Sequence, residues 1–78
     1  METSKAHLAE IQVVVRFMRK RFYDYSEIAD ILVSSGFTKS KYSPDEVEKV
    51  AMGGFGYHGV SKSRYRQLIQ KLPTKVRL

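Results

Sequence analysis

The chain has 78 residues, of which 14 are lysine or arginine and 8 are aspartate or glutamate, so its formal net charge is +6. This length allows one domain with a small core and leaves little room for a cofactor pocket. Because cysteine is absent and no apolar run is long enough to span a bilayer, the sequence excludes disulfide frameworks, thiolate metal sites and membrane spans, and we expect a cytoplasmic protein.

Apolar residues that recur at intervals of three and four predict a first helix from about Lys5 to about Tyr23. Its expected core stripe consists of Leu8, Ile11, Val15, Met18 and Phe22. Four cations load its last two turns, where positive charge suits the negative end of the helix dipole. They are Arg16, Arg19, Lys20 and Arg21. We therefore expect a packed helix with a basic end.

Val13 and Phe17 lie on the side of this helix opposite the core stripe, where a monomer would expose them. A domain this small gains affinity and stability from dimerisation, so these residues are the candidate interface of a possible homodimer. The alternative is that the C-terminal tail folds back over them through Val76 and Leu78. The sequence leaves both arrangements open.

Two capping boxes predict where the second and third helices begin. Asp24 with Glu27 opens the second helix, which should end at Gly36. Ser43 with Glu46 opens the third helix, which has proline at its first position and should end at the following glycine pair. Since no stretch alternates as a strand would, the expected fold class is all-α with four helices.

The excess positive charge lies in the predicted fourth helix and the tail that follows it. Residues 1–60 carry eight cations and eight acids, whereas residues 61–78 carry six cations and no acid. Ser61 caps a helix that should run to Leu72 and stop at Pro73. Ordinary solvated helices mix charges of both signs. An acid-free helix on a charge-balanced domain therefore indicates a polyanionic partner, and nucleic acid is the one we expect.

A turn of 100° per residue divides the polar side chains of the fourth helix into two candidate roles. The expected buried stripe of this helix consists of Tyr65, Leu68, Ile69 and Leu72. Residues opposite this stripe could contact DNA bases, since arginine pairs with guanine and glutamine with adenine. They are Ser63, Arg66, Gln67 and Gln70. Cations on the flanks, in the tail and at the end of the first helix could contact the DNA backbone. They are Lys62, Arg64, Lys75, Arg77, Arg19 and Lys20. The alternative is an ordinary solvated face.

The third helix, a glycine-bearing connection and the fourth helix together make a helix-turn-helix candidate, with residues 25–36 as the helix packed behind it. The residues that carry this pattern are Ala29, Leu32, Gly36, Ser43, Pro44, Val47, Gly53, Gly54, Ser61 and Leu68. In this pattern residues 25–72 resemble the N-terminal DNA-binding module of KfrA-type plasmid regulators and related plasmid and phage proteins. The resemblance implies sequence-specific duplex binding, usually by a dimer.

The connection between the third and fourth helices, residues 53–59, contains a literal G-x-G-x-x-G. A dinucleotide site of this kind needs a preceding strand and an acid about twenty residues further on. A capped helix precedes this one and no acid follows residue 48, so the sequence argues against a Rossmann site. We expect Phe55 and Tyr57 to pack into the core; the alternative is that they stack on a base or form a wing that touches the DNA backbone.

Catalytic and metal-binding residues do not cluster in this sequence. His7 and His58 lie far apart, with no partner ligand at helical or turn spacing. The carboxylates gather at predicted helix starts, where the helix dipole accounts for them without chemistry. We therefore expect neither an enzyme nor a metal or cofactor protein.

The sequence as a whole predicts a single helical domain over residues 1–78, with a helix-turn-helix core at about 25–72. Its expected function is sequence-specific binding of double-stranded DNA by a transcriptional regulator or a plasmid or phage accessory factor, with helix 61–72 in the major groove. The alternative is a small phage-type inhibitor or interaction protein that binds a host enzyme through the same basic surface.

Overall fold

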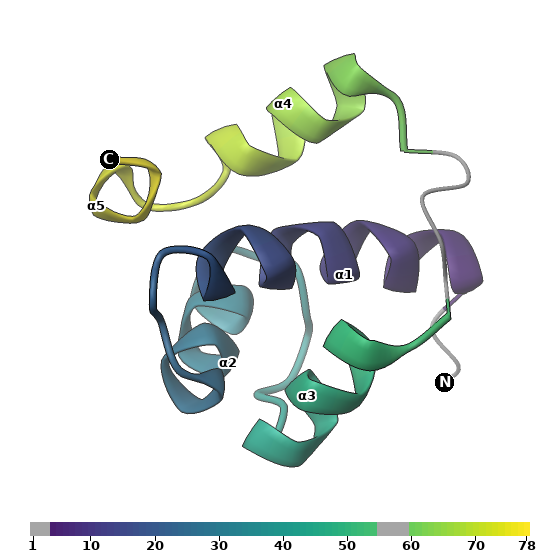
Figure 1. Cartoon of the computed structure of the whole chain (residues 1–78), viewed down its shortest axis with the longest axis vertical. Coiled ribbons are helices and arrows are strands. Elements are labelled where there is room, and N and C mark those ends of the chain that lie inside the picture. Colours follow the sequence, from purple (N-terminus) through teal and green to yellow (C-terminus); the bar gives the residue numbers. More distant parts are fainter. Residues whose placement is uncertain (1–3, 55–59) are drawn as a thin grey trace.

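The computed structural model describes residues 4–54 and 60–78, which form helices joined by short connections (Figure 1). The helices are α1 (Lys5–Arg19), α2 (Tyr25–Ser34), α3 (Pro44–Met52), α4 (Lys62–Gln70) and α5 (Thr74–Arg77). Neither of these two stretches contains a strand, so the all-α fold class is confirmed. The short α5, which follows Pro73, is a fifth helix beyond the four predicted.

Reciprocal capping bonds start α2 and α3 at the predicted positions. The Glu27 amide donates to Asp24 Oδ1 at 2.8 Å, and the Asp24 amide donates to Glu27 Oε1 at 3.4 Å. Ser43 and Glu46 exchange the same pair of bonds, at 3.2 and 3.0 Å. Each box satisfies N–H groups that the first helical turn cannot pair internally. Both predicted helix starts are therefore confirmed.

The chain leaves α1 through a left-handed residue, Phe22, whose φ is 69°. The Phe22 amide donates to the Arg19 carbonyl at 3.0 Å and the Tyr23 amide to the Met18 carbonyl at 3.3 Å, which is the Schellman pattern. The helix consequently ends at Arg19 instead of Tyr23, and the Phe22 side chain is 93% exposed. Its predicted place in the core stripe is wrong. α2 ends with the same pattern at Gly36, as predicted.

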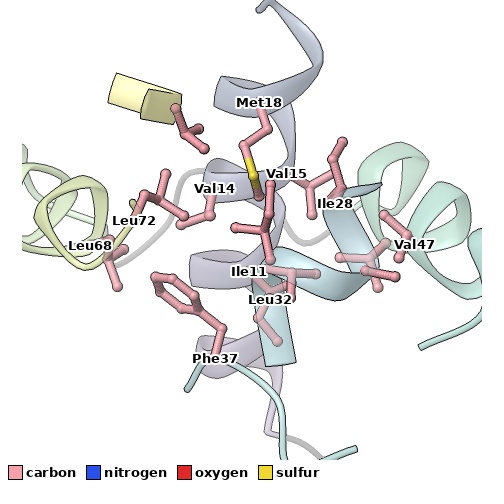
Figure 2. Packing of buried hydrophobic residues seen from close by; sticks show 14 residues of the cluster. Ile11, Val14, Val15, Met18, Ile28, Leu32, Phe37, Val47, Leu68 and Leu72 are labelled. Carbon is pink, nitrogen blue, oxygen red and sulfur yellow. The ribbon is translucent and has the colours of Figure 1, made fainter. Parts of the chain in front are cut away.

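α1 is the central helix of the domain, with α4 on one side of it and α2 and α3 on the other (Figure 1). Figure 2 shows the same division among the buried side chains: Leu68 and Leu72 lie on one side of α1, and Ile28 and Val47 lie on the other. The buried cluster consists of Ile11, Val14, Val15, Met18, Ile28, Ala29, Ile31, Leu32, Phe37, Val47, Val50, Leu68, Leu72 and Val76. Apolar burial on both sides of α1 is thus what holds the helices together.

The side of α1 that was expected to face solvent or a second copy of the chain is covered by α4. Val13 is only 6% exposed, so the expectation that a monomer would expose it is wrong. Phe17 is half-buried, and its ring meets that of Tyr65 edge-on with the centroids 6.4 Å apart. The tail contributes to the core through Val76, whereas Leu78 is 94% exposed.

The third and fourth helices do not pack directly on each other as a helix-turn-helix pair does. α1 lies between them: α3 packs on α1 and α2, and the main partner of α4 is α1 (Figure 1). The third and fourth helices therefore do not form the directly packed pair that the helix-turn-helix interpretation of the sequence expected. The physical reason is that α1 carries apolar side chains on both sides, so the buried stripe of α4 finds its cover there and not on α3.

Candidate nucleic-acid interface

A bidentate ion pair fixes α4 on α1. Arg64 Nε donates to Glu10 Oε2 at 2.7 Å, and Arg64 Nη2 donates to Glu10 Oε1 at 3.1 Å. This hydrogen bonding lowers the pKa of Glu10, against the opposing effect of burial, and raises the pKa of Arg64. The guanidinium also donates to Gln67 Oε1 at 3.3 Å. Arg64, expected to contact the DNA backbone, is instead engaged in holding α4 in place.

The four residues expected to contact bases all lie on the exposed part of α4. They are Ser63, Arg66, Gln67 and Gln70. Leu68, on the opposite side of the helix, is buried against α1, so the ion pair and the apolar contact together present the polar side chains to solvent. The predicted division of α4 into a buried and an exposed side is confirmed, except at Tyr65, which is 38% exposed.

The remaining candidate backbone contacts fall into two groups. Lys62, Lys75 and Lys20 are exposed, and none of them forms an ion pair within the residues that the structure describes. Two arginines are held by neighbouring groups: Arg77 donates to the Gln70 carbonyl and the Thr74 hydroxyl, and Arg19 donates to the Tyr23 carbonyl. Arg19 also lies over the Tyr25 ring, 4.8 Å from its centroid. The lysines are thus the more available of the candidate phosphate contacts.

A pocket of about 390 Å³ opens where the C-terminal half of α1 meets α4. Its lining combines apolar and aromatic side chains with cations and contains no acid: Val13, Arg16, Phe17, Arg19, Lys20 and Tyr65. The pocket therefore joins the exposed side of α4 to the basic end of α1. No sequence pattern indicates this pocket, because the spacing of Tyr65 predicts a buried position and no local signal predicts that α4 packs on α1.

Two side chains of α1 cap the C-terminal end of α3. Gln12, only 2% exposed, donates through Nε2 to the carbonyls of Val50 at 3.0 Å, Ala51 at 3.3 Å and Gly53. Arg16 Nε adds a second donor to the Ala51 carbonyl at 3.1 Å. Carbonyls at a helix end lack intrahelical partners, and these bonds supply donors to the part-buried carbonyls of Ala51 and Gly53. No local pattern pointed to Gln12 as a buried residue.

The described residues contain no group of three or more His, Asp or Glu side chains that could hold a metal ion. His7 is half-buried and donates from Nε2 to the Phe37 carbonyl at 2.9 Å, so its ring is engaged within the fold. Phe55, Tyr57 and His58, with the predictions made for them, lie outside the described residues.

Two further observations bear on the class of protein. Among the described residues, no helix has both the length and the apolar composition needed to cross a bilayer. A comparison with protein-family models found no match, and searches of curated proteins and of solved structures found no significant match either. Any function must therefore be argued from the surface of this domain.

Proposed function

We propose that this chain is a sequence-specific double-stranded DNA-binding domain of a transcriptional regulator or of a plasmid or phage accessory factor. The observation that carries the proposal is the exposed side of α4. It presents Arg66 and Gln70 beside lysines and has no acid on the helix or after it. Arginine and glutamine can make paired hydrogen bonds to guanine and adenine, and lysines can neutralise phosphates.

The packing of α4 supports this role in a way that differs from the helix-turn-helix pair first expected. An α-helix with its side chains is about 10–12 Å across, and the major groove of B-DNA is about 12 Å wide, so one exposed helix can enter it. α4 is backed by α1 and fixed there by the Glu10–Arg64 pair. In the proposed complex α4 reads the groove, while Lys62, Lys75 and Lys20 contact the backbone.

The resemblance to KfrA-type and phage regulators contributes only the biological setting of the proposal. The direct packing of the third helix on the fourth, which a helix-turn-helix pair requires, is replaced here by packing of both helices on α1. A homodimer remains compatible with the proposal, because many DNA-binding domains read two half-sites. Its interface would have to involve surfaces other than the buried Val13.

Selection of binding sites from random duplexes, followed by titration at several salt concentrations, tests this proposal. We expect log affinity to fall linearly with log salt and the slope to decrease by about one unit when Lys62 is replaced by alanine. Arg66→Ala should reduce the preference for one base by about 1–3 kcal/mol. Lys49→Ala, which removes an exposed charge from α3 on the other side of α1, is the matched control and should leave the slope unchanged.

Two results would contradict the proposal. One is equal loss of affinity in the Lys49 and Lys62 variants, which would show that only the net charge matters. The other is negligible affinity of the isolated protein for every duplex, which would favour the interaction-protein alternative, in which the same basic surface meets the carboxylates of an enzyme.

A further inference from the structure

The pocket between α1 and α4 has a composition that the reading of a duplex does not require. Base and phosphate contacts in a groove need extended polar side chains, whereas this pocket has an apolar wall made by Val13, Phe17 and Tyr65. The two rings are held edge-to-face, with an angle of 70° between their planes. Arg21 covers Phe17, its guanidinium carbon 3.6 Å from the ring centroid. Tyr65, at 38% exposed, is the ring that remains available to a ligand.

The charge of the residues that line the pocket determines which class of ligand it favours. Three cations line the pocket and no acid does, so an anion is favoured there. Arg16 is already bonded to the Ala51 carbonyl and Arg19 to the Tyr23 carbonyl, so the exposed Lys20 is the group best placed to meet a negative charge, with the exposed Arg19 beside it in the chain. A simple inorganic anion would leave the aromatic wall uncovered. The ligand that matches both walls is a planar ring joined to a negative group.

The size of the pocket and its position next to α4 narrow the class of ligand further. A volume of about 390 Å³ is at the lower end of the range for small-molecule sites, so the pocket suits one nucleotide unit and not an extended ligand. Tyr65 and Lys62 belong to the same helix, so the pocket continues the basic surface of α4. Each nucleotide of a nucleic-acid strand carries one base and one phosphate. Proteins that bind single-stranded nucleic acid contact the bases with aromatic rings and the phosphates with cations.

We infer that this pocket receives one unpaired nucleotide of a nucleic-acid strand, with its base against Tyr65 and its phosphate at Lys20 and Arg19. The inference rests on the proposed function in that the same surface meets nucleic acid. It adds a preference for DNA in which a base has left the stack, as in a single strand or a bulge. Paired duplex alone leaves the pocket empty.

Fluorescence anisotropy with three labelled probes tests the inference: a short oligothymidine, a duplex with a one-nucleotide bulge, and the same duplex fully paired. Tyr65→Ala should weaken binding of the first two by about 5- to 100-fold, the loss expected for one stacked base, and change the third by less than about twofold. Tyr65→Phe keeps the ring and should bind as the unmodified protein does. Phe22→Ala removes an exposed ring next to the same cations but outside the pocket, so all three affinities should stay unchanged.

Several results would overturn the inference. They are an unchanged affinity of Tyr65→Ala for oligothymidine, an equal loss in Phe22→Ala, and competition by poly-glutamate as strong as that of oligothymidine at equal charge. Amide chemical shifts of the unmodified protein give a second measurement that needs no variant. Added oligothymidine should shift residues 13–20 and Tyr65, and shifts confined to residues 66–78 would also overturn the inference.

The outcomes separate this inference from the proposed function. If the protein binds duplexes with sequence preference but Tyr65→Ala does not change its affinity for the bulged probe, only the inference about the pocket is contradicted. If binding of oligothymidine depends on Tyr65 but the protein shows no preference among duplexes, the inference about the pocket is supported and the proposed function is contradicted.

Discussion

Replacing Gln12 by methionine should destabilise the domain, because Gln12 caps the end of α3 from within the core. Methionine has a similar volume, so the change removes the amide donor while leaving little cavity. The Val50 carbonyl keeps a bond from the Gly53 amide at 3.2 Å, and the Ala51 carbonyl keeps its bond from Arg16. The Gly53 carbonyl has no second donor among the residues described, so it becomes the unpaired group.

An unpaired carbonyl costs about 1–3 kcal/mol when it is fully buried, and because the Gly53 carbonyl is only part-buried we expect a loss of about 1 kcal/mol in the free energy of unfolding. For a domain of this size each kcal/mol lowers Tm by about 4–8 °C. Urea denaturation followed by circular dichroism measures the free energy, and thermal denaturation gives Tm. If Gln12→Met were as stable as the unmodified protein within about 0.5 kcal/mol, the three hydrogen bonds would contribute nothing and the reasoning would be refuted.

Gln12→Glu provides a control with a pH signature. An ionised carboxylate can only accept hydrogen bonds, so it would face the carbonyl oxygens of α3 without a donor, whereas the protonated form can donate one bond. Burial and these oxygens should raise the pKa of the introduced carboxyl above its value in the unfolded chain. The stability that its proton provides is then present at low pH and lost as the pH rises through the raised pKa. A variant whose stability increases with pH in this range would contradict the proposed arrangement.

Three further predictions concern the ends and faces of α1. The pKa of Glu10 is lowered by Arg64, so the stability that this pair provides is present above the ordinary carboxyl pKa and is lost as the pH falls through the pKa of the folded state. When the free energy of unfolding is measured at decreasing pH, Glu10→Gln should lose less stability than the unmodified protein. Equal losses in the two proteins would contradict this prediction. Phe22→Gly should stabilise the domain by up to about 1 kcal/mol, since it relieves a left-handed backbone without removing a packed side chain, and a drop in the urea midpoint would count against it. Phe17→Glu should lower stability by roughly 1–3 kcal/mol because the ring packs on Tyr65. If light scattering shows that the unmodified protein is a dimer and that Phe17→Glu is a folded monomer, Phe17 instead lies in a dimer interface.

Helix starts were predictable from the sequence because their chemistry is local. A capping box joins residues three apart, so Asp24 and Ser43 can be identified without knowing the fold. The end of α1 was not predictable in this way. The left-handed position that closes it is usually glycine, as at Gly36, but here it is occupied by Phe22, whose periodicity suggested the core instead.

The candidate interface was predictable where it depends on one helix and not where it depends on two. The exposure of Arg66 and Gln70 follows from the angular spacing of residues along α4. The role of Arg64 does not, since its partner Glu10 lies 54 residues away and no local pattern relates them. The pocket and the cap at Gln12 were missed for the same reason: each forms only when α1 packs against another helix.

The central place of α1 also sets an order for the folding of the chain during synthesis. α1, α2 and α3 follow one another closely and can associate as soon as all three have left the ribosome. The other side of α1 must wait for Leu68, Leu72 and Val76, which follow α3 in the chain and emerge after it. Until then the nascent chain exposes an apolar strip together with the cations of α1. We expect this intermediate to be the aggregation-prone species, and undocking of α4 to be the easiest opening of the finished domain.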